Sequence, residues 1–178
     1  NFNMFTIILA LGSMPLAFTY PLMKRFTYWP QLFLGVTFNY GLVLGWTSIY
    51  SEIDIAPIVF YIGAIFWTLG YDTIYGFQDI KDDEIIGLKS TSIKFKNNPK
   101  KFLILSYLVL FISLVSVGML MKLNIIYFII LTLIGFQLFY FQIKRLDFKN
   151  PENCLKIFKS NNFFGLVVFL NLIIGKIL

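Results

Sequence analysis

Residues 56–83 read APIVFYIGAIFWTLGYDTIYGFQDIKDD. The part from 56 to 70 carries no charge, and up to Tyr75 the run has the length, about 20 residues, of a helix that crosses a bilayer. It ends in four aspartates, Asp72, Asp79, Asp82 and Asp83. The stretch therefore predicts a membrane span whose end carries a cluster of carboxylates.

The composition extends this interpretation to the whole chain of 178 residues. Hydrophobic residues make up 58% and charged residues 13%, whereas a soluble domain is about a quarter charged. The mean hydropathy is +0.76. We expect an all-α, polytopic transmembrane helix bundle that forms a single membrane domain over residues 1–178. Its six predicted spans are Met4–Tyr20, Leu32–Tyr50, Ala56–Tyr75, Phe102–Met121, Asn124–Ile143 and Phe163–Leu178.

Several kinds of chemistry are excluded by what this chain lacks. It has one cysteine, Cys154, and no histidine, so an internal disulfide, a Cys/His metal site and a Ser-His or Cys-His catalytic pair are ruled out. Any bound metal must be a hard cation held by oxygen. The net charge is +6, but no basic stripe with interleaved aromatics lies outside the spans, and we expect no nucleic-acid partner.

The basic residues alternate between the predicted loops. All but two of the 15 lie in the first, third and fifth loops, and the exceptions are Lys122 and Lys176. By the positive-inside rule these three loops are cytoplasmic. The aspartates that follow the third span are then cytoplasmic too.

Asp72, Tyr75, Asp79 and Asp83 follow one another at i, i+3, i+7 and i+11. On a continuous helix they would share one face, where carboxylates repel each other unless a cation lies between them. This predicts a divalent cation site, and Mg²⁺ in such sites is usually shared with substrate phosphates. Two alternatives remain: a solvated helix end whose acids pair with lysines, which suits Asp82, Asp83 and Glu84 next to Lys81, or a proton relay.

Two neighbouring stretches carry further polar groups. In TYPLMKR (19–25), Lys24 and Arg25 end the first span and fit either interfacial anchoring or binding of a phosphate. In GLKSTSIKF (87–95), Lys89 and three hydroxyl residues fit either a lid over a phosphate or a solvated loop.

Together these stretches resemble the UbiA-type intramembrane aromatic prenyltransferases, most closely the 4-hydroxybenzoate polyprenyltransferases. The family's motif D-x-x-Y-[AG]-x-x-D-x-x-x-D is matched by DTIYGFQDIKDD, with Asp72, Tyr75, Asp79 and Asp83 at its fixed positions. Its Y-x-x-x-K element is matched by YPLMK, residues 20–24. The resemblance covers essentially the whole chain.

One departure from the family pattern concerns a second aspartate motif. The motif N-D-x-x-D-x-x-x-D, which the family carries on its second span, does not occur in these 178 residues. The six predicted spans match the last six of the family's nine helices, and the chain starts at Asn1 directly before an apolar run. The resemblance implies the C-terminal two-thirds of such an enzyme, with the N-terminal part missing, and we expect these residues alone to be inactive.

The resemblance also implies a reaction, its substrates and a cofactor. A polyprenyl group would pass from polyprenyl diphosphate to the position ortho to the hydroxyl of 4-hydroxybenzoate, in ubiquinone biosynthesis. Asp72, Asp79 and Asp83 would hold Mg²⁺. Lys24 and Arg25 would bind the diphosphate, although Arg25 can equally pair with the carboxylate of the acceptor.

The remaining residues are expected to bind substrate less directly. Lys89 is a further candidate for the diphosphate, and Tyr20 for substrate binding. Tyr75 would donate to a diphosphate oxygen or shield the allylic cation with its ring. Asn161 and Asn162 would either cap the last helix or line the cavity.

Three other predictions accompany this function. The acceptor can instead be a naphthoate, a homogentisate or a porphyrin, and a different class, a cation-coupled membrane transporter, also fits acids in a membrane. The expected location is the bacterial inner membrane, with the mitochondrial inner membrane as the alternative. Membrane lipid is an expected partner in every case.

Overall fold

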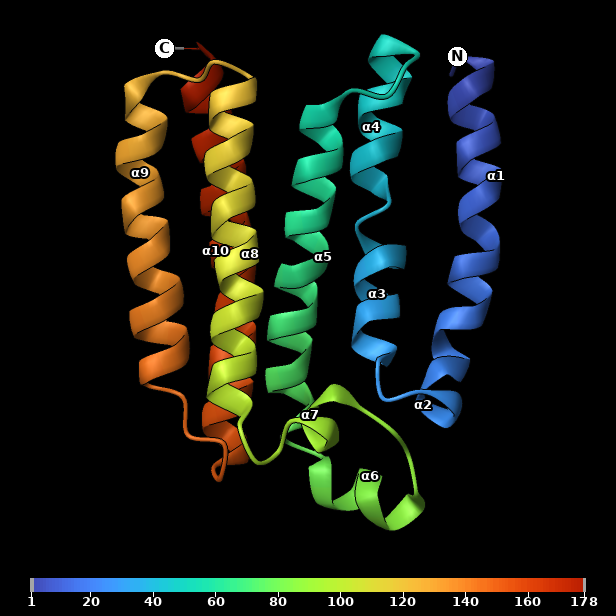
Figure 1. The fold of residues 1–178 in the computed structure, drawn as a ribbon, viewed down its shortest axis with the longest axis vertical. Helices are drawn as coiled ribbons and strands as arrows, with labels where there is room; N and C mark the ends of the chain where they lie inside the picture. Colours follow the sequence, from blue (N-terminus) through green and yellow to red (C-terminus); the bar gives the residue numbers. More distant parts are fainter. Residues whose placement is uncertain (1, 178) are drawn as a thin grey trace.

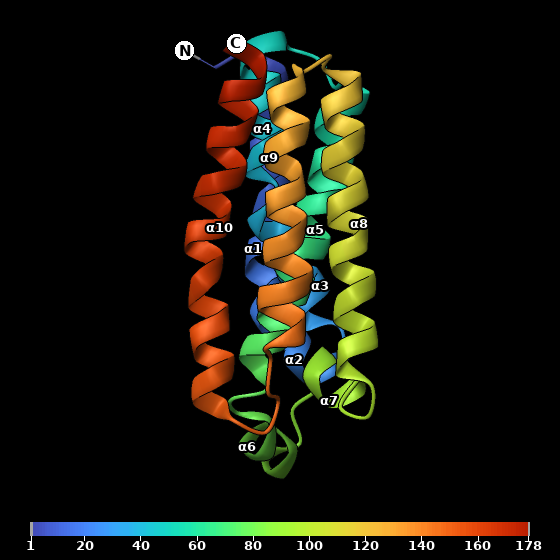
Figure 2. The ribbon, with the colours of Figure 1, turned by 90° about the vertical axis from the view of Figure 1, so that its left-hand side faces the viewer.

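The computed structural model describes residues 2–177, which form helices and short connections and no strand. In chain order the elements are α1 (Met4–Thr19), the 3-10 turn η1 (Tyr20–Leu22), α2 (Met23–Phe26), α3 (Pro30–Phe38), α4 (Gly41–Tyr50), α5 (Ile55–Gly76), α6 (Ile80–Ile86), α7 (Thr91–Lys94), α8 (Pro99–Leu120), α9 (Ile125–Phe136), the π-helical segment η2 (Gln137–Lys144) and α10 (Pro151–Ile177). The long helices lie side by side along one axis (Figures 1 and 2).

Within residues 2–177, six helical segments are long and apolar enough to cross a membrane. They are Met4–Phe26, Pro30–Tyr50, Ile55–Gly76, Pro99–Leu120, Ile125–Lys144 and Pro151–Ile177. The predicted number of spans is confirmed, and the chain is an integral membrane helix bundle. The predicted boundaries hold within a few residues except at the start of the last span, and its predicted end, Leu178, lies outside the described residues.

The last helix begins at Pro151 rather than at Phe163, so the predicted start of this span was wrong. Proline at the first helical position needs no donor, and the Asn150 side chain accepts from Asn153 N at 3.1 Å, as an N-cap does. Residues 156–162, which carry two lysines, a serine and two asparagines, therefore continue the helix below its apolar part. The length of the apolar run alone did not predict this extension.

The second span is broken halfway, between α3 and α4, where a continuous helix was predicted. Asn39 follows the end of α3, and its side-chain nitrogen donates to Gly35 O at 2.8 Å and to Thr68 Oγ1 at 2.8 Å. It also donates to Ala64 O at 3.2 Å. The amide thus ties the break to α5, which satisfies polar groups at a depth where lipid offers no partner.

Helix α5 lies at the centre of the bundle between α3 and α8 (Figure 1). Its seam with α8 is close because glycine occupies two positions: a Cβ on Gly63 would lie 2.5 Å from Ser113 Oγ, and one on Gly70 would clash with the Tyr107 ring. Leu69 and Leu103 are buried in the same seam. This tight contact holds the lower half of α5, which carries the predicted site.

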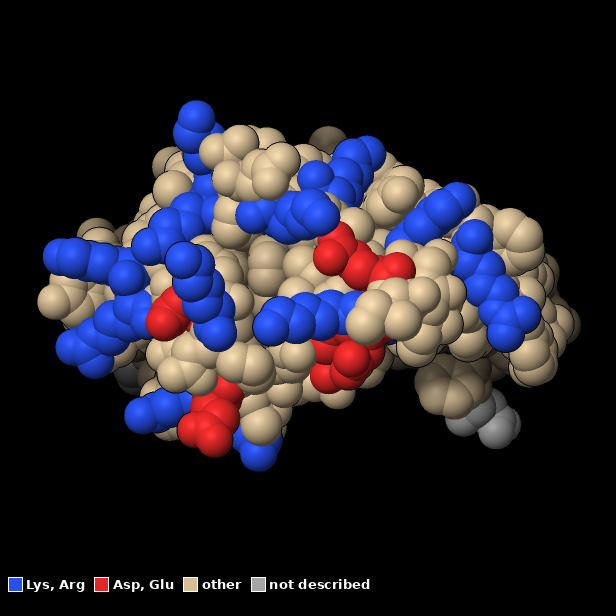
Figure 3. Space-filling model, turned by 90° about the horizontal axis from the view of Figure 1, so that it is seen from below, with Lys and Arg blue, Asp and Glu red and all other residues tan. Residues whose placement is uncertain are grey.

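The three basic loops meet at one end of the bundle, together with the short helices α6 and α7 (Figure 1). Seen from that end, Lys and Arg side chains surround a smaller group of acidic ones (Figure 3). The clustering agrees with the predicted topology, in which this end faces the cytoplasm.

Candidate functional site

The aspartate motif does not lie on one helix face, and that prediction was wrong. Helix α5 ends at Gly76 and α6 begins at Ile80. A Cβ on Gly76 would clash with the Ser92 hydroxyl, and the next residue, Phe77, is buried against the Phe148 ring with centroids 4.8 Å apart. The contacts of Gly76 and Phe77 with distant side chains therefore turn the chain between Asp72 and Asp79.

A polar cavity of about 190 Å³ lies where α5 meets η1, α2 and the start of α3. Its polar side chains are Tyr20, Lys24, Gln31 and Asp72. Lys24 Nζ lies 3.7 Å from Asp83 Oδ2, and Asp83 is buried with 8% of its surface exposed. The fold therefore brings one lysine to two carboxylates that are eleven positions apart in the motif.

The other predicted site residues lie outside this cavity. Asp79 is exposed at the start of α6. Tyr75 is 40% exposed and packs on the Phe158 ring of α10, with centroids 4.8 Å apart. Arg25 is exposed on α2. Over residues 2–177, no three His, Cys, Asp or Glu side chains come together as a metal-binding group.

The donor set around the cavity nevertheless suits Mg²⁺ shared with a substrate. One or two carboxylates, with water and phosphate oxygens, are the usual Mg²⁺ ligands in phosphoryl sites. Asp72 and Asp83 supply two carboxylates beside one lysine. The residues present fit one side of a metal–diphosphate site.

The hydroxyl residues of the loop 87–95 are not solvated, so the interpretation as a solvated loop was wrong, whereas the lid over a phosphate stays a prediction. Ser90, Thr91 and Ser92 are all fully buried. Thr91 Oγ1 and Thr73 Oγ1 share a hydrogen bond of 2.6 Å, and Ser92 Oγ donates to Thr73 O at 2.9 Å. The three hydroxyl residues lie in the protein interior, and two of them fasten α7 to the lower end of α5.

Gln31 is a site residue that the sequence reasoning missed. It is 3% exposed, lines the polar cavity, and accepts from Thr91 N at 3.0 Å through Oε1. It thus joins α3 to the loop that follows the aspartates. A glutamine placed directly after Pro30, at the start of an apolar helix, was the only signal in the sequence.

Lys89 joins the same loop to the first basic segment. Its backbone N donates to Lys24 O at 2.8 Å, and its Nζ donates to Phe26 O at 3.4 Å. The ammonium also lies 5.7 Å from the centroid of the Tyr28 ring. The structure therefore shows Lys89 bracing the segment that carries Lys24.

Asn161 and Asn162 lie inside α10, so the capping interpretation was wrong. Asn162 is exposed. Asn161 is 5% exposed, and its Oδ1 accepts from Trp67 Nε1 at 2.9 Å and from Gln142 Nε2 at 3.0 Å. The Asn161 amide thus belongs to a polar network inside the bundle.

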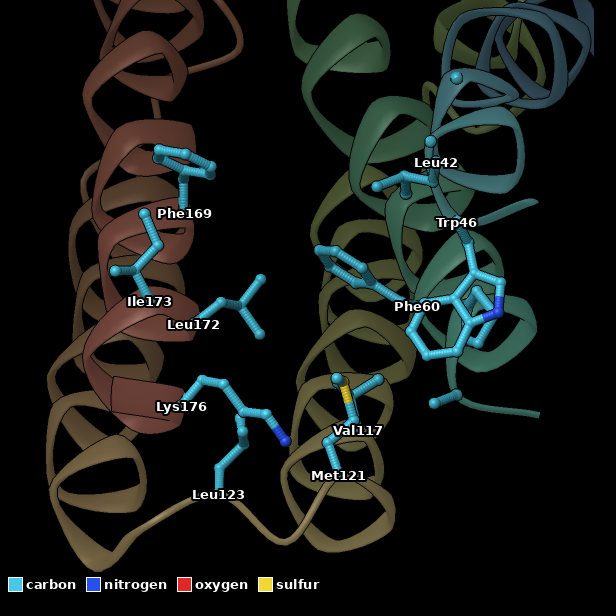
Figure 4. A pocket seen from close by; sticks show the side chains of 14 residues that line it. Leu42, Trp46, Phe60, Val117, Met121, Leu123, Phe169, Leu172, Ile173 and Lys176 are labelled. Carbon is cyan, nitrogen blue, oxygen red and sulfur yellow. The ribbon is translucent and has the colours of Figure 1, made fainter. Parts of the chain in front are cut away.

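An apolar channel leads away from the polar end. One cavity of about 220 Å³ includes Trp67 in its lining, and a second of about 460 Å³ extends to Lys176. Both are lined by Leu42, Phe60, Phe169 and Leu172, so they adjoin. Figure 4 shows the second cavity, with the Lys176 side chain directed into it from α10.

The channel begins close to the polar cavity. Trp67 and Asp72 lie on α5 about 7.5 Å apart along the helix axis. Tyr71 lies between them, with its ring centroid 5.4 Å from that of Trp67. The apolar path thus starts on the α10 side of the helix whose end carries Asp72.

A comparison with known protein families identifies the family of this chain. The model of the UbiA prenyltransferase family matches residues 1–173. The chain belongs to this family. UbiA membership confirms the resemblance inferred from the two motifs.

Individual UbiA relatives share much of this sequence. The chain is 43% identical to "4-hydroxybenzoate polyprenyltransferase, mitochondrial" of Bos taurus, over 98% of the chain and 47% of the relative. The Homo sapiens protein of the same name gives the same three values. Identity to "4-hydroxybenzoate geranyltransferase 1" of Lithospermum erythrorhizon is 37%, over 99% of the chain and 58% of that protein. The chain spans about half the length of the curated relatives it matches, and no solved structure matches it.

Proposed function

We propose that the protein containing this chain transfers a polyprenyl group from polyprenyl diphosphate to the ring carbon ortho to the hydroxyl of 4-hydroxybenzoate, a step of ubiquinone biosynthesis. One observation carries this proposal: Lys24 and Asp72 line a polar cavity at the end of α5, Asp83 pairs with Lys24, and apolar cavities follow the same helix from Trp67 to Ala56. A diphosphate bearing a long hydrocarbon needs both parts. The names of the 43% identical relatives support the acceptor.

In this proposal the polar cavity binds the diphosphate. Asp72 and Asp83 would hold Mg²⁺, with Asp79 as a further acid near the entrance, and the metal supplies charge neutralisation on the diphosphate oxygens. Lys24 lies close enough to Asp83 to serve the same anion. Arg25 would bind the diphosphate or the acceptor carboxylate from the rim.

The chain's own residues then favour cleavage of the allylic C–O bond. As that bond breaks, negative charge builds on the leaving oxygen, and a fixed ammonium such as Lys24 lowers the barrier because it needs no reorganisation. Tyr20 lines the same cavity and would donate to the anion. Tyr75, exposed beside Phe158, would shield the cation.

The apolar channel would hold the polyprenyl tail. From Asp72 to Ala56, which lines the far cavity, α5 rises about 24 Å, enough for a tail of several isoprene units. The lining is apolar except at the ends, so it offers few partners to the water that would capture an allylic cation.

The remaining predictions are kept in this proposal as follows. Lys89 and Asn162 stay candidates for substrate contact, secondary to the cavity residues. We propose that residues 1–178 form the C-terminal part of one membrane domain and act only with the rest of it. Relatives named as mitochondrial favour the mitochondrial inner membrane over the bacterial one.

The test is product formation by the protein expressed at its full natural length and purified into lipid nanodiscs. Polyprenyl diphosphate and Mg²⁺ are supplied with 4-hydroxybenzoate, or with a naphthoate or homogentisate as competing acceptors. We expect prenylated 4-hydroxybenzoate as the main product and its loss on chelation of the metal. Preferential prenylation of another acceptor would replace the substrate assignment, and solute flux without any prenylated product would favour the transporter.

A further inference from the structure

Trp67 lies at the lower end of the apolar channel and is held against α10 by two contacts. Its indole Nε1 donates to Asn161 Oδ1 at 2.9 Å. Its six-membered ring lies over Gly165, where an added Cβ would come within 2.9 Å of ring carbon Cη2. Asn161 and Gly165 are about one helical turn apart. One helix therefore holds the polar edge of the indole and also leaves room for its ring.

Asn161 is itself fixed by its neighbours. Its Oδ1 also accepts from Gln142 Nε2 at 3.0 Å, and Gln142 Oε1 accepts from Tyr107 Oη at 2.7 Å. Its Nδ2 donates to the carbonyls of Ile157 and Phe158, both at 3.2 Å. The amide thus bonds to protein through both of its ends, and the network ties α8, η2 and α10 to Trp67.

We propose that Asn161 is a positioning residue that holds the Trp67 ring beside the allylic carbon of the prenyl donor. The inference rests on the proposed function. Because the indole N–H is turned toward Asn161, the polar edge of the ring is occupied and its carbon atoms line the channel. An indole face attracts cations more strongly than other side-chain rings. Trp67 and Asp72 lie about 7.5 Å apart along the axis of α5 and about 140° apart around it, so the ring would meet C1 where the donor turns from the Asp72 side of the helix toward α10.

The Trp67 ring influences which of two products the allylic cation forms. The C1–O bond of the donor breaks, and its electron pair leaves with the diphosphate. C1 then bonds to the acceptor carbon ortho to the hydroxyl, and that carbon loses its proton to a base. If water reaches C1 first, its oxygen forms the bond, a proton is released, and the product is free polyprenol. A ring held beside C1 stabilises the cation and occupies the space that water would need.

The first test quantifies both products with the full-length protein in nanodiscs. Trp67→Leu keeps an apolar side chain but removes the ring, and we expect about a tenfold loss of kcat and a larger share of polyprenol. Trp67→Phe keeps a ring face and should stay within about threefold of wild type. Unchanged kcat and product ratio in Trp67→Leu would overturn the proposal.

The second test separates positioning from a general structural role. Asn161→Leu should raise the polyprenol share in the wild-type background and have little further effect in the Trp67→Phe background, since no indole N–H is left to hold. An equal effect in both backgrounds would overturn the proposal.

A third variant reaches the ring from α10 without replacing any side chain of the polar network. Gly165→Ala should displace the indole and raise the polyprenol share. An unchanged product ratio in Gly165→Ala would also count against the inference. Failure of the wild type to prenylate any acceptor would instead refute the proposed function.

Discussion

The two ends of the substrate path differ in how they are built. At the basic end, Lys24 and Asp72 line a small polar cavity, and Asp83, from a third helix, pairs with Lys24. Toward the other end, the channel is formed by the sides of α4, α5, α8 and α10. Substrate binding at the polar end therefore depends on a few individual side chains, whereas at the apolar end it depends on the combined shape of many.

The largest expected effect is at the polar end. Asp72→Asn removes a carboxylate from the cavity, and we expect prenyl transfer by the full-length protein to fall by about 100-fold. The measurement is transfer of labelled polyprenyl to 4-hydroxybenzoate. Asp82→Asn changes an exposed acid of the same motif and should retain activity within about twofold. Comparable losses in both variants would break the distinction between the cavity and its surroundings.

The next largest effect is expected at Gln31, which joins α3 to the loop 87–95 at the polar end. Gln31→Leu leaves the buried Thr91 N–H without its acceptor, which costs roughly 1–3 kcal/mol. We expect a lower unfolding temperature and faster tryptic cleavage in the loop 87–95. The matched control is Gln78→Leu, whose side chain bonds only to Tyr75 O in an exposed turn. Equal protease resistance in both variants would contradict the bracing role.

At the apolar end, donor preference should depend on the volume of the channel rather than on any charge. Leu172→Trp adds bulk where both channel cavities meet, and we expect the preference for long over short prenyl diphosphates to fall by about tenfold. The measurement is kcat/KM for donors of two chain lengths. Leu170→Trp places the same side chain on an exposed position of α10 and should leave the preference unchanged. A shift of the preference in both variants would show that the channel does not determine the preferred chain length.

The smallest effect is expected at the outer rim. Lys96 Nζ pairs with Glu84 Oε1 at 2.6 Å, and both side chains are well exposed. Lys96→Ala should therefore change the free energy of unfolding by less than about 1 kcal/mol and leave activity intact. A large loss of activity would extend the functional site to Glu84 and the segment that follows α7.

The sequence predicted the spans, the basic end and the family because these follow from local composition and from two fixed motifs. It did not predict the turn between Gly76 and Ile80, since the turn depends on Ser92 and Phe148 from other parts of the chain. Gln31 and the Asn161 network were missed for the same reason. A polar residue inside an apolar run carries no sign of which distant atom it will bond.

The length of α10 has a consequence for the surrounding lipid. Its 27 residues extend about 40 Å, whereas the hydrocarbon core of a typical bilayer is about 30 Å thick. The helix must tilt or project, and its lower part carries Lys156 and Lys159. Because α10 also holds the Trp67 ring, a change in bilayer thickness that alters its tilt would be transmitted to the substrate path. The protein's turnover should therefore depend on the acyl-chain length of its lipids.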